Sequence, residues 1–189
     1  TIDRYSDPTT GASYNILLTL AANSWVQGVE GNRSIGSHVM ITRSSRITVR
    51  GSYFHDSYIY DGSGTRGYGV TVSDHASDNL IEGNVFIHLR HAMMVKVGAN
   101  GNVFGYNDSH DPYRSETFND FAGDISLHGH YPFANLFEGN IVANIILDQY
   151  WGPNGPHNTF LRNRAEWYGI LITPDTNLSN NQNFVGNEV

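Results

Sequence analysis

Residues Asn135–Val142 read N-L-F-E-G-N-I-V, an apolar alternation that runs into a Gly-Asn corner. This pattern recurs along the chain, so the repeat is interpreted before any single segment. Close copies lie at Asp78–Phe86, Gly101–Tyr106, Asn158–Asn163 and Asn183–Asn187, and looser ones at Trp25–Val29 and Ile47–Tyr53.

The spacing of the copies predicts a solenoid. The corner residues are Gly28, Gly51, Gly83, Gly105, Gly139, Arg162 and Gly186. They are separated by 23, 32, 22, 34, 23 and 24 residues, and periods of about 20–50 residues are typical of solenoids. The two long steps indicate the same coil with about ten extra residues, which emerge as loops on one face. We place these insertions within His55–Gly69 and Asn107–Gly123, where the apolar alternation is lost.

Each coil carries a second apolar alternation before its corner, as at Ile125/Leu127, Ile145/Leu147 and Ile170/Ile172. Alternation of period two indicates strands with one buried face, and stacked coils make such strands parallel. Asparagine at repeated corners fits, because it tolerates the left-handed conformation and forms ladders along a stack. The sequence therefore predicts an all-β, single-stranded parallel β-helix of about seven coils of 22–24 residues with two loop insertions.

Three segments carry a resemblance to a known family: D-N-L-I-E-G-N-V-F (78–86), F-A-N-L-F-E-G-N-I-V (133–142) and H-N-T-F-L-R-N-R (157–164). They resemble repeats of right-handed parallel β-helices of the pectate-lyase-like superfamily, and the resemblance covers nearly the whole chain. It implies that fold and a binding groove on the outward face of the strand at Gly169–Ile172 and its equivalents. The superfamily includes polysaccharide lyases, glycoside hydrolases, esterases, tailspikes and adhesins, so the fold does not select one activity.

Composition excludes several classes of protein. The formal charge of −7 argues against a nucleic-acid partner. No apolar run approaches the ~18 residues that span a bilayer. The absence of cysteine excludes disulfides and thiol catalysis. We expect one domain over residues 1–189, and because neither end shows a cap, we expect a fragment of a longer solenoid or a unit covered by neighbours.

Side-chain parity predicts a polar patch on the outward face. If Ile125, Leu127 and Leu147 point inward, the residues that alternate with them point outward. A step of 22 residues from Ile125 to Leu147 is expected to set His128 beside Tyr150 and Ser126 beside Asp148. The predicted patch consists of Lys96, Asp124, His128 and Asp148.

These four residues are our candidate catalytic groups on a sugar. Paired Asp124 and Asp148 can share a proton or hold Ca²⁺, and glycoside hydrolysis uses two carboxylates. Lyase chemistry needs a base, for which Lys96 or His128 is suited. A strand face exposed to water carries polar residues in any case, so the patch is also compatible with no activity. The His128-Gly129-His130 motif is too weak a signal to predict a copper or zinc site.

Aromatic residues follow the patch. Tyr150, Trp151 and Tyr131, with His130, are candidate substrate-binding residues because exposed rings stack on sugars. Arg114, in the second insertion, is a further candidate. The alternative is that Trp151 packs under its own glycine- and proline-rich turn.

Two functions remain open at this point. The first is a polysaccharide-engaging β-helix outside the cell or at its surface, which binds or cleaves its ligand; whether it is an enzyme is left open. The second is a non-catalytic structural or adhesive solenoid that associates end to end by strand addition.

Overall fold

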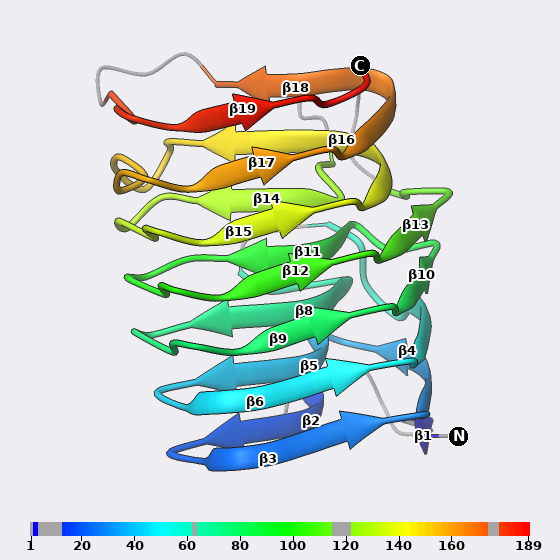
Figure 1. The fold of residues 1–189 in the computed structure, drawn as a ribbon. Helices are drawn as coiled ribbons and strands as arrows, with labels where there is room; N and C mark the ends of the chain where they lie inside the picture. Colours follow the sequence, from blue (N-terminus) through cyan, green and yellow to red (C-terminus); the bar gives the residue numbers. More distant parts are fainter. Residues whose placement is uncertain (1, 4–12, 62–63, 115–121, 174–177) are drawn as a thin grey trace.

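The computed structural model describes residues 2–3, 13–61, 64–114, 122–173 and 178–189. Within these ranges the regular structure consists of strands, and neighbouring strands pair in parallel. The chain winds as a parallel β-helix whose coils stack along one axis (Figure 1), which confirms the predicted fold class. The described segments contain no helix that is long and apolar enough to cross a membrane.

Each coil has up to three sides. The strands of the first side are β2 (Tyr14–Thr19), β5 (Ser37–Thr42), β8 (Tyr68–Ser73), β11 (His91–Val95) and β14 (Ile125–His128). Those of the second side are β3 (Ala22–Gln27), β6 (Ser45–Arg50), β9 (Leu80–Glu82), β12 (Val103–Gly105), β15 (Leu136–Glu138), β17 (Thr159–Leu161) and β19 (Asn183–Val185).

The third side joins the first in the upper coils. Its strands are β1 (Ile2–Asp3), β4 (Glu30–Ser34), β7 (Tyr53–Ser57), β10 (Val85–Ile87) and β13 (Asp108–His110). The longer strands β16 (Ile141–Asp148) and β18 (Arg164–Ile172) run through both sides, so that the two sides form one 12-stranded sheet.

The corner after the second side repeats a left-handed backbone conformation. Gly51, Gly83 and Gly139 have φ of 56°, 60° and 64° there. Tyr106, with φ 55°, occupies the equivalent corner of the fourth coil. The expected corner residue Gly105 instead lies within β12, in register with Glu82 and Glu138. The sequence assignment was therefore wrong by one residue, because a glycine stands next to the true corner.

Aromatic rings stack through the core. Phe104, Phe137 and Phe160 are fully buried, and the centroid of Phe137 lies 5.0 Å and 4.8 Å from those of its two neighbours. Phe184 continues the stack at 5.1 Å from Phe160. The stack forms because the parallel register places the same inward position of each coil directly above the last.

Two ladders of buried asparagines border this core. In one, each side-chain amide donates to the Oδ1 of the next asparagine at 2.8–2.9 Å, through Asn79, Asn102, Asn135 and Asn158. The other links Asn84, Asn107, Asn140, Asn163 and Asn187 at 2.8–3.1 Å. These ladders satisfy corner backbone groups that have no strand partner, and they confirm the ladders expected of the repeated asparagines. The left-handed conformation also expected of them was wrong, because the neighbouring corner residues, such as Gly83 and Gly139, adopt it instead.

Both insertions connect the third side to the first. Strands β7 and β13 occupy the start of the expected segments, so the additional residues lie after Ser57 and after His110. Part of the second insertion, residues 115–121, lies outside the described residues.

The centre of the first side's outward face is covered rather than open. Thr71, Met94 and Ser126 point outward by parity, yet each is at most 1% exposed. Thr65 of the first insertion accepts a hydrogen bond from Lys96 at 3.0 Å and so helps to cover this face. The outward groove implied by the family resemblance is therefore not present at this position.

Candidate functional site

Three of the four predicted catalytic residues share one outward column at the end of the first side. Leu127 pairs with Val95 in the preceding coil and with Leu147 in the next. The residues that follow these three are Lys96, His128 and Asp148. Parity and register together therefore place their side chains on the same flank.

His128 and Asp148 form the closest pair in this column. The Nδ1 of His128 lies 2.5 Å from Oδ2 of Asp148, and both side chains are about three-quarters buried, at 25% and 20% exposed. The backbone N–H of Tyr150 donates to the other carboxylate oxygen at 2.7 Å. Burial is the largest single effect and raises the pKa of Asp148, but the hydrogen bonds from His128 and Tyr150 and the charges of His128 and His91 together outweigh it, so the pKa is lowered.

This pair is suited to proton transfer. A carboxylate that accepts from Nδ1 holds the imidazole in one orientation and leaves Nε2 for a second partner. The Nε2 of His128 makes no hydrogen bond to the described part of the chain. The arrangement can therefore supply a general base or acid at the surface of the solenoid.

Lys96 lies one coil away from His128. Its ammonium group donates to Thr65 Oγ1, and burial lowers its pKa although the charge of Asp74 opposes the change. Thr65 was not among the predicted site residues. It belongs to an insertion without periodicity, so no pattern in the sequence places it over the first side.

Asp124 does not join the column. Its side chain is 1% exposed and accepts hydrogen bonds from Ser109 Oγ at 2.7 Å and from the backbone N–H groups of Ala143 and Asn144 at 2.8 and 3.0 Å. Burial raises its pKa to about 6. The expected outward orientation was wrong, because the chain bends before β14 and turns this side chain toward β13 and β16.

The predicted carboxylate pair is consequently absent. Asp124 is bound to the backbone of Asn144, whereas Asp148 is in register with His128. Four residues of strand separate the two carboxylates, roughly 13 Å at ~3.3 Å per residue. The expected step of 22 residues between Ile125 and its neighbour in the next coil was also wrong. Ile125 pairs with Ile145 rather than Leu147, and Ser126 pairs with Ile146 rather than Asp148.

An aromatic cluster borders the His128–Asp148 pair. Tyr150 and Trp151 are 74% and 51% exposed, with their rings perpendicular and 4.9 Å apart. The ring of His130 stacks on Trp151 at 6.0 Å with an interplanar angle of 14°. His128 meets the edge of the same indole at 6.4 Å. We call Tyr150, Trp151 and His130 the aromatic platform.

Tyr131 extends this region into a shallow groove. The groove is lined by Tyr131, Pro153, Asn154, Pro156, Leu178, Asn180 and Asn181. Gly155 lies under the Tyr131 ring, where an added Cβ would approach the ring carbons to 2.9 Å. The ring therefore lies flat on the turn only because this position is glycine.

Arg114 lies near the buried histidine behind the column. Burial, with smaller contributions from the charges of Arg90, His128 and Arg114, lowers the pKa of His91 to about 3. The His91 Nδ1 is 2.7 Å from the carbonyl oxygen of Gly123. The neutral ring is thus a structural contact between β11 and the second insertion.

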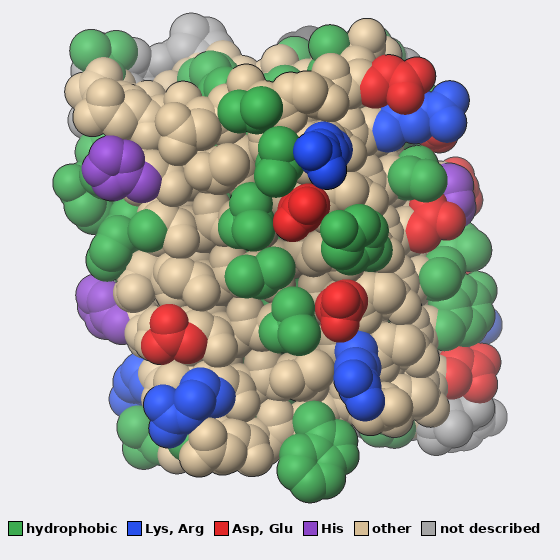
Figure 2. Space-filling view, in the orientation of Figure 1, with side chains coloured by type: hydrophobic (Ala, Val, Ile, Leu, Met, Phe, Trp, Pro, Cys, Tyr) green, Lys and Arg blue, Asp and Glu red, His purple; other side chains and the backbone are tan. Residues whose placement is uncertain are grey.

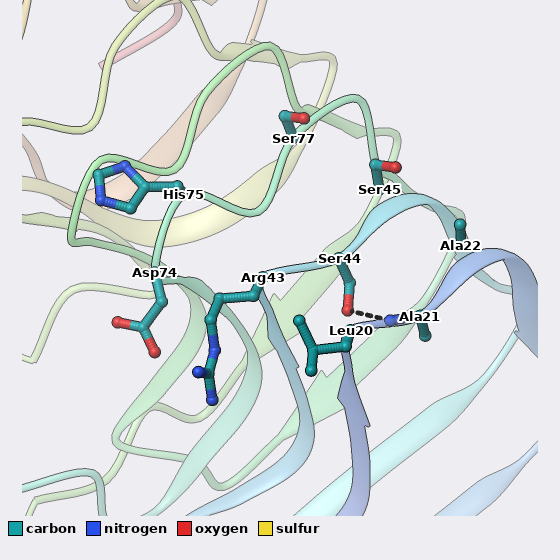
Figure 3. Close-up of a pocket in the computed structure, with 9 residues that line it drawn as sticks. All are labelled: Leu20, Ala21, Ala22, Arg43, Ser44, Ser45, Asp74, His75 and Ser77. Atoms are coloured by element: carbon teal, nitrogen blue, oxygen red, sulfur yellow. Dashed lines mark hydrogen bonds between the residues drawn. The ribbon is translucent and has the colours of Figure 1, made fainter.

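A second depression lies in the first three coils (Figure 3). It is lined by Leu20, Ala21, Ala22, Arg43, Ser44, Ser45, Asp74, His75 and Ser77. Asp74 accepts a hydrogen bond from Thr42 Oγ1 at 2.6 Å, and Arg43 extends beside it. No aromatic ring other than His75 lines this depression, so it lacks the stacking surface of the aromatic platform.

No group of three or more His, Asp or Glu side chains that could hold a metal occurs among the described residues. The expected Ca²⁺ would have used Asp124 and Asp148 together. Because these carboxylates do not converge, the structure offers no support for that particular ligand set.

Comparison with known proteins adds no assignment. No protein-family model, no curated protein and no solved structure matches this chain.

Proposed function

We propose that this chain is an extracellular carbohydrate-engaging β-helix of the pectate-lyase-like type, which binds a polysaccharide over the aromatic platform. The observation that carries the proposal is that the rings of Tyr150 and Trp151 are exposed and are also held in place, by their contact with each other and by the stacking of His130 on Trp151. Rings fixed in this way lose little conformational entropy on binding, and their apolar faces suit the C–H face of a sugar ring.

If the bound glycan is cleaved, lyase chemistry fits the site better than hydrolysis. Hydrolysis uses two carboxylates about 5–9.5 Å apart, and Asp124 and Asp148 are farther apart than that. Elimination removes the proton beside the carboxylate of a uronate sugar, and the Nε2 of His128 can accept this proton. The glycosidic C–O bond then breaks as the C=C bond forms, and the departing oxygen takes a proton from water. The expected product is then an unsaturated sugar that absorbs in the ultraviolet.

The test is a glycan titration followed by isothermal titration calorimetry, so that the readout does not depend on the tryptophan that is replaced. Trp151→Ala is expected to weaken binding of a responsive glycan at least tenfold. Trp25→Ala is the matched control, since Trp25 is 72% exposed on the second side and remote from the platform. Equal affinities of the two variants and the wild-type chain would reject the platform as the binding site.

Catalysis is tested separately. His128→Ala is expected to abolish formation of an unsaturated product while leaving binding within a few-fold. Binding without product for the wild-type chain would restrict the function to a binding module.

A non-catalytic, end-to-end stacking solenoid is the second candidate. In the last described coil, Phe184 continues the phenylalanine stack but is 39% exposed, and β19 pairs on one side only. A strand edge of this kind can accept a further strand. Rods that lengthen with concentration in electron micrographs, without glycan binding, would favour this candidate.

A further inference from the structure

The outward face of the second side carries an apolar column between two rows of charges, seen face-on in Figure 2. Trp25, Thr48, Leu80 and Val103 follow one another in register on β3, β6, β9 and β12. Trp25 is 72% exposed. A large indole exposed on a flat sheet contributes little to the stability of a single chain, so this face can gain free energy by being covered.

Four charges surround the centre of this column. Arg46 and Arg50 belong to β6, and Asp78 and Glu82 flank Leu80 in the next coil. Arg46 donates to Asn23 Oδ1 at 2.7 Å and Arg50 to Gln27 Oε1 at 3.2 Å, both toward the preceding coil. Within the described part of the chain, none of the four makes an ion pair.

This arrangement is self-complementary in one orientation. We propose that two copies of the chain pair antiparallel through this face, about a two-fold axis that runs along the strands between β6 and β9. This two-fold rotation reverses the order of the coils, so that β6 of one copy faces β9 of the other. Each residue keeps its position along the strand direction. Arg46 then meets Asp78 of the second copy, Arg50 meets its Glu82, and symmetry repeats both contacts.

Parallel pairing is disfavoured by the same charges. A two-fold axis along the solenoid would place Arg46 against Arg50 of the second copy and Asp78 against its Glu82. Like charges opposed in an interface are repulsive, so the pattern selects the antiparallel dimer.

The antiparallel operation also places β3 of one copy against β12 of the other. Gly105 in β12 is a strand glycine without a positive φ, and an added Cβ would meet only the Glu138 carbonyl at 3.9 Å. Neither its backbone nor its neighbours require glycine. By the operation above, Trp25 of one copy lies over Val103 of the second copy, and Gly105 lies opposite Gln27. Gly105 is buried in its own chain and has no side chain, so the outward position next to Val103 on β12 adds nothing beside the indole.

Charge reversal tests the pairing. In sedimentation equilibrium, the wild-type chain is expected to dimerise, and Arg46→Glu/Arg50→Glu and Asp78→Arg/Glu82→Arg are each expected to be monomeric. An equimolar mixture of the two variants restores four opposite-charge contacts and is expected to form a heterodimer. Circular dichroism and thermal melts check that each variant is folded.

The relative orientation of the two copies is tested by disulfide cross-linking. The chain has no cysteine, so only the introduced cysteines can react. A Thr48→Cys chain mixed with a Leu80→Cys chain is expected to form a disulfide-linked heterodimer, because these positions face each other across the axis. A monomeric wild-type chain, or a mixture of charge variants that stays monomeric, would overturn the proposal. Loss of glycan binding by Trp151→Ala would be unaffected by either result.

Discussion

His128 and Asp148 are joined between adjacent coils by a 2.5 Å contact of Nδ1 and Oδ2, in direct register on β14 and β16. The contact exists because a parallel solenoid sets one position of each coil above the same position of the next. It gives the only outward histidine of β14 a fixed ring orientation beside the aromatic platform.

Asp148→Asn tests the contribution of this pair to stability. The pKa of Asp148 is lowered in the folded chain, so its ionised form contributes stability that is present above the unfolded pKa of about 3.9 and lost as pH falls through the folded value. The variant should therefore lose most stability, relative to the wild type, near pH 7, and the difference should shrink below about pH 4. Urea unfolding at several pH values measures this.

The matched control is Asp61→Asn, which is expected to change stability by less than about 0.5 kcal/mol because the Asp61 carboxylate makes no hydrogen bond or ion pair with the described residues. A difference for Asp148→Asn that does not vary with pH would contradict the assignment of the pair.

Asn135→Ala interrupts a buried ladder. Asn135 accepts from Asn102 at 2.9 Å and donates to Asn158 at 2.9 Å and to the Ala99 carbonyl at 3.0 Å. Its removal leaves buried partners unsatisfied, so the free energy of unfolding should fall by about 2–4 kcal/mol. The control is Asn183→Ala. Asn183 is exposed and is hydrogen-bonded to Thr159, so its replacement should lower the free energy of unfolding by less than about 0.5 kcal/mol. Equal losses of stability for the two variants in urea unfolding would argue against the ladder.

Phe137→Ala opens a cavity in the middle of the phenylalanine stack. The ring lies between two parallel neighbours and is fully buried, so the expected loss is about 3–5 kcal/mol. Phe184→Ala, at 39% exposure, should cost clearly less. Thermal or urea unfolding of both variants measures the difference, and the reverse order would mean that the core lies elsewhere.

Asp124→Asn should change the pH dependence in the opposite direction to Asp148→Asn. The folded pKa of Asp124 is raised to about 6 by burial, so the folded chain binds the proton more tightly and wild-type stability falls as pH rises from about 4 through 6. An amide can still pair with Ser109 and the two backbone N–H groups. The variant should therefore gain stability relative to the wild type between pH 4 and pH 7, and parallel pH profiles would contradict this.

Much of the architecture could be predicted because it is repeated. One register from coil to coil explains the spacing of the corners, the repeated asparagines and the inward positions of Phe104, Phe137 and Phe160. Each copy of the repeat therefore supports the interpretation of the others. Errors arose where the repeat is broken. Gly105 stands one residue before the true corner at Tyr106, and the coil from β14 to β16 is shorter than the step that the alternation indicated.

The candidate site was predicted in part for the same reason. Parity and the repeat suffice to place Lys96, His128 and Asp148 in one column. They do not suffice for Asp124, which precedes a strand where the chain bends, nor for Thr65, which lies in an insertion with no periodicity.

The amino-acid sequence alone determined the winding, because apolar alternation and asparagine corners recur often enough to define which residues stack. Only the tertiary structure decided what each outward side chain contacts. The first insertion helps to cover the centre of the first side, and a bend buries Asp124. On the second side, Arg46 and Arg50 are exposed and make no ion pair with the described residues. Such contacts depend on where non-repeating segments lie and how side chains turn, and neither leaves a periodic signal in the sequence.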